Sequence, residues 1–174
     1  WITGVFYPNT KFGILNLGKE INAQAVLKVQ DYSEYILPDD NSIGQIYFDM
    51  NEQLLILGEP GSGKTMLMLQ LAEILLGQAQ IDDSQSIPIV LNLSSWAINQ
   101  AILENWLINE INKNYGIPKK FVQSYLNQNR FILMLDGLDE IVDQETREKC
   151  VLTINSYKSK HKNIKVVICS RTKD

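Results

Sequence analysis

GEPGSGKT, residues 58–65, is the stretch that decides the fold of this 174-residue chain. It fits the pattern G-x-x-x-x-G-K-[ST], in which glycines let backbone N–H groups turn inward around a polyphosphate. Lys64 would place its charge beside the β- and γ-phosphates, and the Thr65 hydroxyl would reach magnesium. With the next residue of the following helix, the predicted nucleotide-binding set is Gly58, Glu59, Pro60, Gly61, Ser62, Gly63, Lys64, Thr65 and Met66.

The residues on either side of the motif fit a strand before it and a helix after it. Residues 53–57 (QLLIL) form a short run that is apolar on both faces, as in a buried parallel strand. Residues 64–76 favour a helix that is buried on most sides, because leucine and methionine occur nearly all round it, and Gly77 is a plausible stop. This is the context in which the motif forms a phosphate-binding loop.

Strands and helices alternate along the rest of the chain. Helices are predicted at 98–115, from about Pro118, and after the capping residue Asp143. Such alternation indicates a parallel sheet with right-handed crossovers, and the predicted fold class is a three-layer α/β P-loop NTPase with about four strands. The strands beyond the first are predicted at 87–93 (IPIVLNL), 131–135 (FILML) and 164–169 (IKVVIC).

Acidic residues follow the strand predicted at 131–135. Asp136 stands at its tip, where an aspartate is the usual partner of a P-loop threonine on magnesium. Asp139 and Glu140 come just after, and either could orient or activate the attacking water as a general base. Asp139 is favoured for this role, and the sequence leaves both residues as candidates.

The order of strands along the chain favours the ATPase (ASCE, AAA+-like) branch of P-loop proteins. One extra strand lies between the P-loop strand and the Asp136 strand, so the strand at 164–169 would fill the gap between those two in the sheet. Its tip would carry Ser170 and Arg171 toward the γ-phosphate. Arg171 could sense that phosphate or stabilise charge on it.

Residues 1–50 are harder to interpret, because glycines and prolines punctuate short apolar pieces. They are predicted to be an N-terminal extension that leads into a nucleotide-binding domain at 51–174. Within them, 37–42 (LPDDNS) has the composition of a loop, and 46–48 could be a short strand or a turn of helix. The chain starts at Trp1 and stops just after a strand-like run, so we expect it to be a piece of a longer protein.

Composition narrows the partners and the compartment. The net charge of −4 provides no global basic field, and no basic surface studded with aromatic residues is visible, so nucleic-acid binding is not expected. No apolar run approaches the ~20 residues of a membrane span, and no signal peptide is visible. Cys150 and Cys169 stand in apolar contexts without metal spacing, as expected of reduced core residues in a cytoplasmic protein.

With these pieces together, the chain resembles the NACHT family of STAND P-loop NTPases. In that family a small residue follows the magnesium aspartate, as Gly137 does here, and more acids follow soon after. The stretches PIVLNLSSWA (88–97) and WITGV (1–5) are similar to bacterial, especially cyanobacterial-type, members. The motifs that carry the resemblance are GEPGSGKT at 58–65, LMLDGLDE at 133–140 and ICSRT at 168–172.

The resemblance implies an ATP/ADP switch that uses Mg²⁺, closed with ADP and able to self-associate with ATP. Such proteins serve signalling, often in innate immunity or anti-phage defence. Lys64 and Thr65 would take the P-loop roles, Asp136 the magnesium role, and Arg171 the sensor role. Asp139 or Glu140 would serve hydrolysis, and residues 37–48 would contribute to the adenine pocket.

Several parts of the family's pattern are not found in this sequence. These are the helical and winged-helix modules, their histidine that touches the nucleotide, and a fifth strand. We therefore expect the chain alone to bind nucleotide weakly and to hydrolyse it slowly or not at all. Effector and ligand-sensing domains are expected outside this sequence.

Two other functions compete with the switch. A P-loop GTPase would carry N-K-x-D, but Asn112-Lys113 is followed by Asn114-Tyr115, and a P-loop kinase would have an arginine-rich lid, which is not visible. A binding module without hydrolysis is the third reading, and the presence of Asp139 and Glu140 argues mildly against it.

Overall fold

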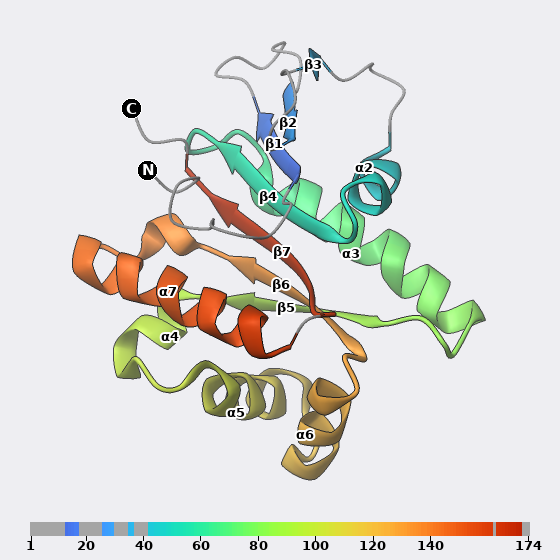
Figure 1. The fold of residues 1–174 in the computed structure, drawn as a ribbon, viewed down its shortest axis with the longest axis vertical. Helices are drawn as coiled ribbons and strands as arrows, with labels where there is room; N and C mark the ends of the chain where they lie inside the picture. The colour runs from blue at the N-terminus through green and yellow to red at the C-terminus, as the bar shows by residue number, and fades with distance from the viewer. Residues whose placement is uncertain (1–12, 18–25, 30–34, 37–41, 162, 172–174) are drawn as a thin grey trace.

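The fold is a seven-stranded sheet with helices on both faces (Figure 1). The computed structural model describes residues 13–17, 26–29, 35–36, 42–161 and 163–171. Five central strands run parallel, and β2 (Val26–Val29) and β3 (Tyr35–Ile36) extend the sheet antiparallel beyond β1. This confirms the predicted three-layer α/β class. In sheet order the parallel strands are β1 (Gly13–Leu17), β4 (Gln53–Gly58), β7 (Lys165–Ser170), β6 (Phe131–Asp136) and β5 (Ile87–Asn92).

Each face of the sheet has its own core, because successive side chains of a strand point to opposite faces. Leu54 and Ile56 pack with α2 (Ile43–Asp49) and α3 (Lys64–Ile81). Leu55 and Leu57 belong to the other core. That core is covered by α4 (Ser94–Asn99), α5 (Leu103–Tyr115), α6 (Lys119–Asn127) and α7 (Gln144–Lys160).

The predicted position of the last strand is confirmed. β7 lies between β4 and β6, pairing Leu57 with Ser170 on one side and Leu135 with Ile168 on the other. The carboxyl ends of these parallel strands therefore meet at one edge of the sheet. The phosphate-binding motif, the acidic cluster and Arg171 follow the ends of β4, β6 and β7, so they lie at that edge.

The expectation of about four strands was wrong, because residues 1–50 contribute β1, β2 and β3. β1 takes a fifth parallel position beside β4, with Gly13 opposite Leu54. A five-residue strand is too short for its periodicity to be recognised, and its pairing with β4 is a contact between distant parts of the chain. These residues thus share the sheet of the segment after residue 51, and the boundary at residue 50 stays a prediction.

Two helix predictions need correction. Helix α3 continues through Gly77 to Ile81, and it is not buried on most sides. Met68, Leu71 and Leu75 are buried against the sheet, whereas Met66 is 70% exposed. The cause is that the sheet and α2 cover only part of the surface of α3. The single helix expected at 98–115 is two helices, since Gln100 takes a left-handed conformation between α4 and α5.

The structure confirms several predictions about single residues and short segments. Residues 46–48 are helical, within α2, whose first turn is capped by the Ser42 hydroxyl. Residues 37–41 of the expected loop lie outside the described residues. Asp143 caps α7, accepting a hydrogen bond from the Thr146 N–H at 2.7 Å. Both cysteines are free and buried, as expected.

The outer edge of the sheet at β5 is closed against a further strand. The backbone of Val90 points away from β6, and the Tyr115 hydroxyl both accepts from its N–H and donates to its carbonyl, each at 2.9 Å. Pro88 has no N–H to offer, and the Asn92 carbonyl accepts from the Ser95 hydroxyl. Open strand edges invite pairing between molecules, and this one has no free pair of groups at these positions.

We predict that Tyr115→Phe lowers the free energy of unfolding by about 1–2 kcal/mol, because it removes two hydrogen bonds and reopens the edge at Val90. Chemical denaturation measures the loss, and light scattering at rising concentration would detect the self-association that an open edge permits. Tyr125→Phe is the matched control, since its ring packs on Phe131 and no hydrogen bond is found for its hydroxyl among the described residues. Equal stability and equal association of the two variants would contradict the assignment.

Candidate nucleotide-binding site

The phosphate-binding motif forms the turn from β4 into α3. Gly61 and Gly63 have φ angles of 77° and 88°, which side chains other than glycine rarely adopt, and a Cβ at either position would meet nothing within 4 Å. Gly63 starts the helix without a side-chain cap. The first N–H groups of α3 thus have no partner within the helix, and with the positive end of the helix dipole they form a site for an anion.

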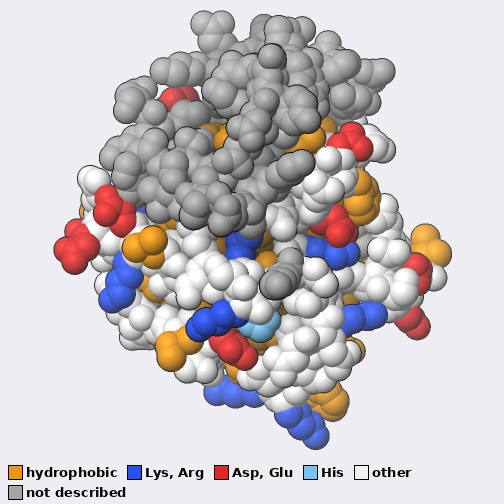
Figure 2. Space-filling model, in the orientation of Figure 1, with side chains coloured by type: hydrophobic (Ala, Val, Ile, Leu, Met, Phe, Trp, Pro, Cys, Tyr) orange, Lys and Arg blue, Asp and Glu red, His pale blue; other side chains and the backbone are white. Residues whose placement is uncertain are grey.

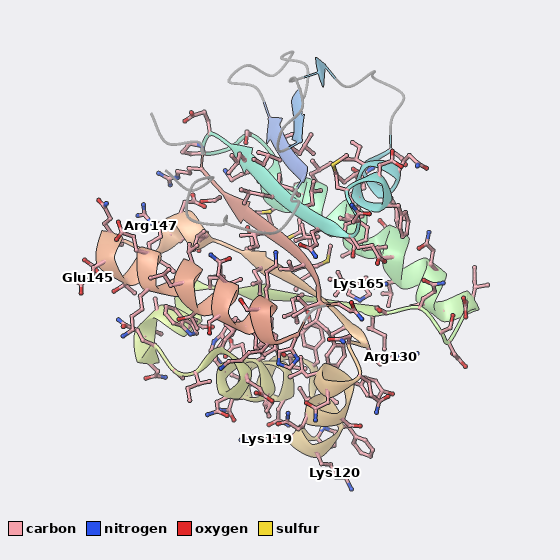
Figure 3. The ribbon with its side chains drawn as sticks, in the orientation of Figure 1. Lys119, Lys120, Arg130, Glu145, Arg147 and Lys165 are labelled. Atoms are coloured by element: carbon pink, nitrogen blue, oxygen red, sulfur yellow. The ribbon has the colours of Figure 1, made fainter. Side chains whose placement is uncertain are left out.

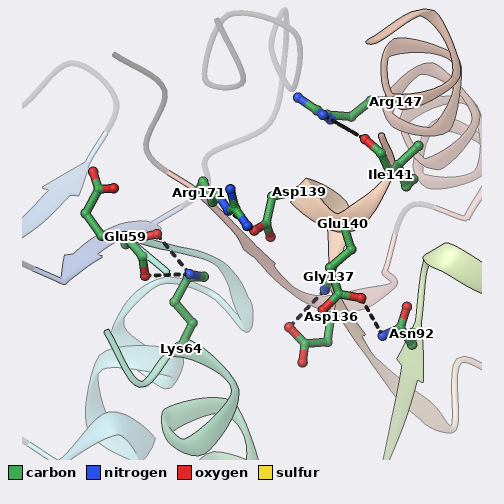
Figure 4. Close-up of polar contacts among 11 residues, drawn as sticks. Glu59, Lys64, Asn92, Asp136, Gly137, Asp139, Glu140, Ile141, Arg147 and Arg171 are labelled. Carbon is green, nitrogen blue, oxygen red and sulfur yellow. Dashed lines mark hydrogen bonds and ion pairs between the residues drawn. The ribbon is translucent and has the colours of Figure 1, made fainter. Parts of the chain in front are cut away.

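Lys64 folds back over this turn. Its ammonium donates hydrogen bonds to the carbonyls of Gly58 at 2.9 Å and Glu59 at 3.0 Å (Figure 4). Nearby, the buried Ser62 hydroxyl has no hydrogen-bond partner in the described part of the structure. A polyphosphate fits both features, because its oxygens can accept from the ammonium and from the hydroxyl.

Thr65 and Asp136 meet across the sheet edge. The Thr65 hydroxyl donates to Oδ2 of Asp136 at 2.8 Å, while Oδ1 of Asp136 accepts from the Gly137 N–H at 2.9 Å. The described residues contain no group of three or more His, Cys, Asp or Glu that could hold a metal alone. The Thr65 hydroxyl and the Asp136 carboxylate are oxygen donors that could hold Mg²⁺, an ion that binds through one or two protein oxygens together with phosphate oxygens and water.

Gly137 makes the acidic cluster turn sharply. Its φ of 73° leads from β6 into a 3-10 helix at Leu138–Glu140, and the buried Leu138 anchors that helix in the core. A Cβ at Gly137 would lie 2.7 Å from Oε2 of Glu140. The requirement for a small residue here thus has two causes, the backbone conformation and the Glu140 carboxylate that folds over it.

The two candidate acids are each engaged. Arg171 donates from Nε to Oδ2 of Asp139 at 2.7 Å, and Oε2 of Glu140 accepts from the Asn92 amide at 3.0 Å (Figure 4). The Arg171 side chain is 52% exposed, so its ion pair is of the kind worth ~1 kcal/mol or less and is readily exchanged. Lys64, Thr65, Asp136, Asp139, Glu140 and Arg171 all lie at the same edge of the sheet.

The sequence comparison agrees with this geometry. A family model for the NACHT domain matches residues 52–173. The chain belongs to the NACHT-domain family. It is therefore a nucleotide-binding NTPase module. Comparisons with curated proteins and with solved structures give no match.

One residue at this edge of the NACHT domain, Asn92, escaped the sequence analysis. Asn92 ends β5 in register with Asp136, and a polar residue at the carboxyl end of an apolar strand was the available signal. Ser170 was expected, with Arg171, to point toward the γ-phosphate, and this stays a prediction. Its hydroxyl is fully buried without a hydrogen-bond partner in the described structure.

Cys169 lies directly beneath the P-loop but is not equipped for chemistry. Its sulfur is 3.8 Å from the Lys64 carbonyl oxygen and 3.6 Å from the sulfur of Met68. Burial, reinforced by the nearby negative charge of Asp136, raises the pKa of the thiol well above its usual range. Cys169 therefore stays a neutral packing residue under the phosphate site.

Of the segment 37–48 expected to contribute to the adenine pocket, residues 37–41 lie outside the described residues, and the contribution of the segment stays a prediction. Ile43, Ile46 and Tyr47 of α2 are buried in the core, and Gly44 packs on Ile74 of α3. Ile74 lies ~15 Å along the helix from Lys64, at 1.5 Å per residue. A hollow of about 580 Å³ opens beside the P-loop, lined by Leu17, Ser62, Gly63, Met66, Leu67, Leu69, Gln70 and Glu73.

No helix among the described residues is long and apolar enough to cross a membrane. On the face in Figure 2, acidic and basic side chains are interspersed, and Figure 3 shows Lys119, Arg147 and Lys165 spread over three separate elements.

We predict that Gly137→Ala destabilises the domain by about 1–3 kcal/mol, because a Cβ is strained at positive φ and collides with Glu140. Gly77→Ala is the matched control: Gly77 lies inside α3 with open space around it, so alanine there should stabilise by ~0.5–1 kcal/mol. Urea unfolding of both variants measures the difference. A neutral Gly137→Ala would contradict the described turn.

Proposed function

We propose that this NACHT domain binds ATP and ADP with Mg²⁺ and works as a slow ATPase switch within a larger protein. The observation that carries the proposal is the meeting of Thr65 and Asp136 beside the folded-back Lys64. It places a cation, a hydroxyl and a carboxylate around one end of an uncapped helix. These are the groups that phosphate and Mg²⁺ require together.

In this proposal the chain's own residues divide the work of phosphate binding. The Lys64 ammonium leaves the carbonyls of Gly58 and Glu59 and pairs with the β- and γ-phosphate oxygens. Thr65 and Asp136 would hold Mg²⁺, which would supply positive charge to offset that of the phosphates. The backbone N–H groups at the start of α3 add fixed positive dipoles that need no reorganisation.

Hydrolysis requires a base and a group that responds to the γ-phosphate. Asp139 and Glu140 are the candidates for the base, and Arg171 for the sensor. Because the Arg171–Asp139 pair is exposed, an incoming γ-phosphate can compete with Asp139 for the guanidinium. That exchange would couple the nucleotide state to the segment that carries Asp139, which is the property a switch needs.

The hollow beside the P-loop supports the proposal that a nucleoside binds next to the phosphates. Its lining combines the apolar side chains of Met66, Leu67 and Leu69 with polar Gln70 and Glu73. An apolar slot with a few polar groups is typical of sites for a flat base. The absence of N-K-x-D from the sequence favours adenine over guanine, and a P-loop kinase or GTPase of another class is the alternative.

The cellular role belongs to the proposal as well. We propose signalling or defence, such as innate immunity or anti-phage defence, in the cytoplasm, with self-association in the ATP state of the full-length protein and with effector and sensor domains outside this chain. The net charge of −4, which provides no global basic field, supports a domain that does not bind nucleic acid directly.

A nucleotide-binding module without hydrolysis is the second candidate. The observation that favours it is that both acids are engaged, Asp139 by Arg171 and Glu140 by Asn92. A carboxylate still has a second oxygen for water, so engagement does not exclude a base. Phosphate release at saturating ATP separates the two candidates.

We predict that ATP and ADP with Mg²⁺ bind the chain, that GTP does not compete, and that Lys64→Ala weakens binding at least ~100-fold, since it removes a charge-assisted contact to phosphate. Titration of a fluorescent ATP analogue measures this. Lys113→Ala is the matched control, because that lysine is exposed in the last turn of α5. Equal affinity for the Lys64→Ala variant and the unmodified chain would refute the site.

A further inference from the structure

A second hollow lies in the helical layer that covers the face of the sheet opposite α3. It holds about 430 Å³ and is bounded by the turn between α4 and α5 on one side and by α7 on the other. α7 runs beside both of those helices (Figure 1). The volume falls within the ~300–1,000 Å³ that is usual for ligand sites, and the P-loop, the acidic cluster and β7 contribute none of the lining. The hollow is therefore separate from the nucleotide site.

One wall of the hollow is a single stripe along α7. Its members recur every three or four residues, which places them on the same face of the helix. Lys149 and Lys160 mark the two ends of the stripe, ~16 Å apart along the helix axis at 1.5 Å per residue. Leu152 lies between them and is 61% exposed. The stripe consists of Lys149, Leu152, Thr153, Ser156 and Lys160.

The opposite wall is held rigidly against α7. Gln100 has a φ of 44°, a strained conformation for a residue other than glycine. Its amide donates to the Thr146 hydroxyl at 3.2 Å and accepts from the Lys149 ammonium at 2.7 Å. The carbonyl of the next residue, Ala101, accepts from the indole N–H of the buried Trp96 at 2.9 Å. The wall is thus formed before any partner binds, which lowers the ordering cost of binding.

Large apolar side chains line the hollow from both walls and remain open to solvent. Ile102 is 72% exposed on the wall opposite Leu152 of α7. Leu103 and Tyr157 are almost completely buried and line the inner part of the hollow. Exposed aliphatic side chains around a hollow are typical of surfaces that bind the apolar face of another protein.

The lining is basic although the chain as a whole carries a net charge of −4. Lys149, Lys160 and His161 are accompanied by one carboxylate. That carboxylate, Glu104, already accepts from the Gln123 amide at 2.6 Å. Among the described residues, no carboxylate lies within ion-pairing distance of either lysine. The negative end of the helix dipole accounts for Lys160 in the last turn of α7, but not for Lys149, which lies nearer the start of the helix.

We propose that this hollow is a docking groove for an acidic amphipathic helix of a partner protein. The apolar face of that helix enters between Ile102 and Leu152, and its carboxylates pair with Lys149 and Lys160. Two cations about three helical turns apart match carboxylates at both ends of a helix that lies along α7, whereas a small anion reaches only one of them. The opposite charges also speed association and select against basic partners. The inference is independent of the nucleotide site.

The test uses the whole chain and a hydrocarbon-stapled helical peptide of about 15 residues, with leucines on one face and a glutamate at each end of that face, about three turns apart. Fluorescence anisotropy of the labelled peptide measures its affinity. We expect saturable binding that weakens at least ~10-fold in the variant that combines Lys149→Glu with Lys160→Glu, because attraction at both ends becomes repulsion. Ile102→Ser should also weaken binding by ~5-fold or more, since it removes an apolar contact.

A charge swap gives the second readout. The same peptide with lysines in place of its glutamates should bind the unmodified chain at least ~10-fold more weakly and should regain affinity for the double variant. Lys119→Glu, at an exposed lysine of α6 outside the groove, is the control and should leave both affinities unaltered. An unfolding midpoint within a few degrees of that of the unmodified chain establishes that each variant is folded.

Three results would overturn the proposal. The first is the absence of saturable binding, or equal affinity of the unmodified chain for the acidic and the basic peptide. Self-association of the unmodified chain at rising concentration, lost in the double variant, would make a second copy of the chain the occupant. Binding of decanoate that is lost in the double variant, without binding of the peptide, would make the groove a site for a small amphipathic anion.

Discussion

The geometry of the candidate nucleotide-binding site depends on one contact, the hydrogen bond between the Thr65 hydroxyl and Asp136. These residues are 71 positions apart, Thr65 at the start of helix α3 and Asp136 at the end of strand β6, and their contact depends on the strand order in which β7 lies between β4 and β6. That insertion aligns three strand ends at one edge, where the backbone is free to turn. The two cores on either face then serve to keep the strands, and hence the two side chains, in register.

Three glycines with positive φ angles form the turns that follow the strand ends at the site. Gly61 and Gly63 open the loop before α3, and Gly137 turns the chain just after Asp136. Gly61 and Gly63 allow backbone N–H groups to face the phosphate site. Gly137 allows the carboxylates that follow it to face the same site. The stability of the fold comes from apolar burial elsewhere, and the site is built from groups whose hydrogen bonding is left incomplete or exchangeable, such as Ser62 and the Arg171–Asp139 pair.

Much of this was accessible from the sequence, and for identifiable reasons. The strands at 53–58, 87–92, 131–136 and 165–170 are runs of four or more apolar residues, so burial on both faces leaves a clear pattern. The prediction that α3 is buried on most sides was wrong, because the composition of a helix shows how many of its residues are apolar but does not show which of its faces another element covers. β1 was missed because a five-residue strand gains its stability from pairing with β4, a contact that no local pattern records.

The sequence by itself determined the phosphate-binding loop, the strand that carries Asp136 and the class of fold, because these depend on local spacing: glycines where the backbone must turn, and apolar residues where the chain must be buried. Only the tertiary structure decided what each acid faces. Asp139 meets Arg171 from β7, and Glu140 meets Asn92 from β5, although the two acids are adjacent in the chain. Their partners come from separate strands, and strand order in a sheet is fixed by long-range packing rather than by the residues beside each acid.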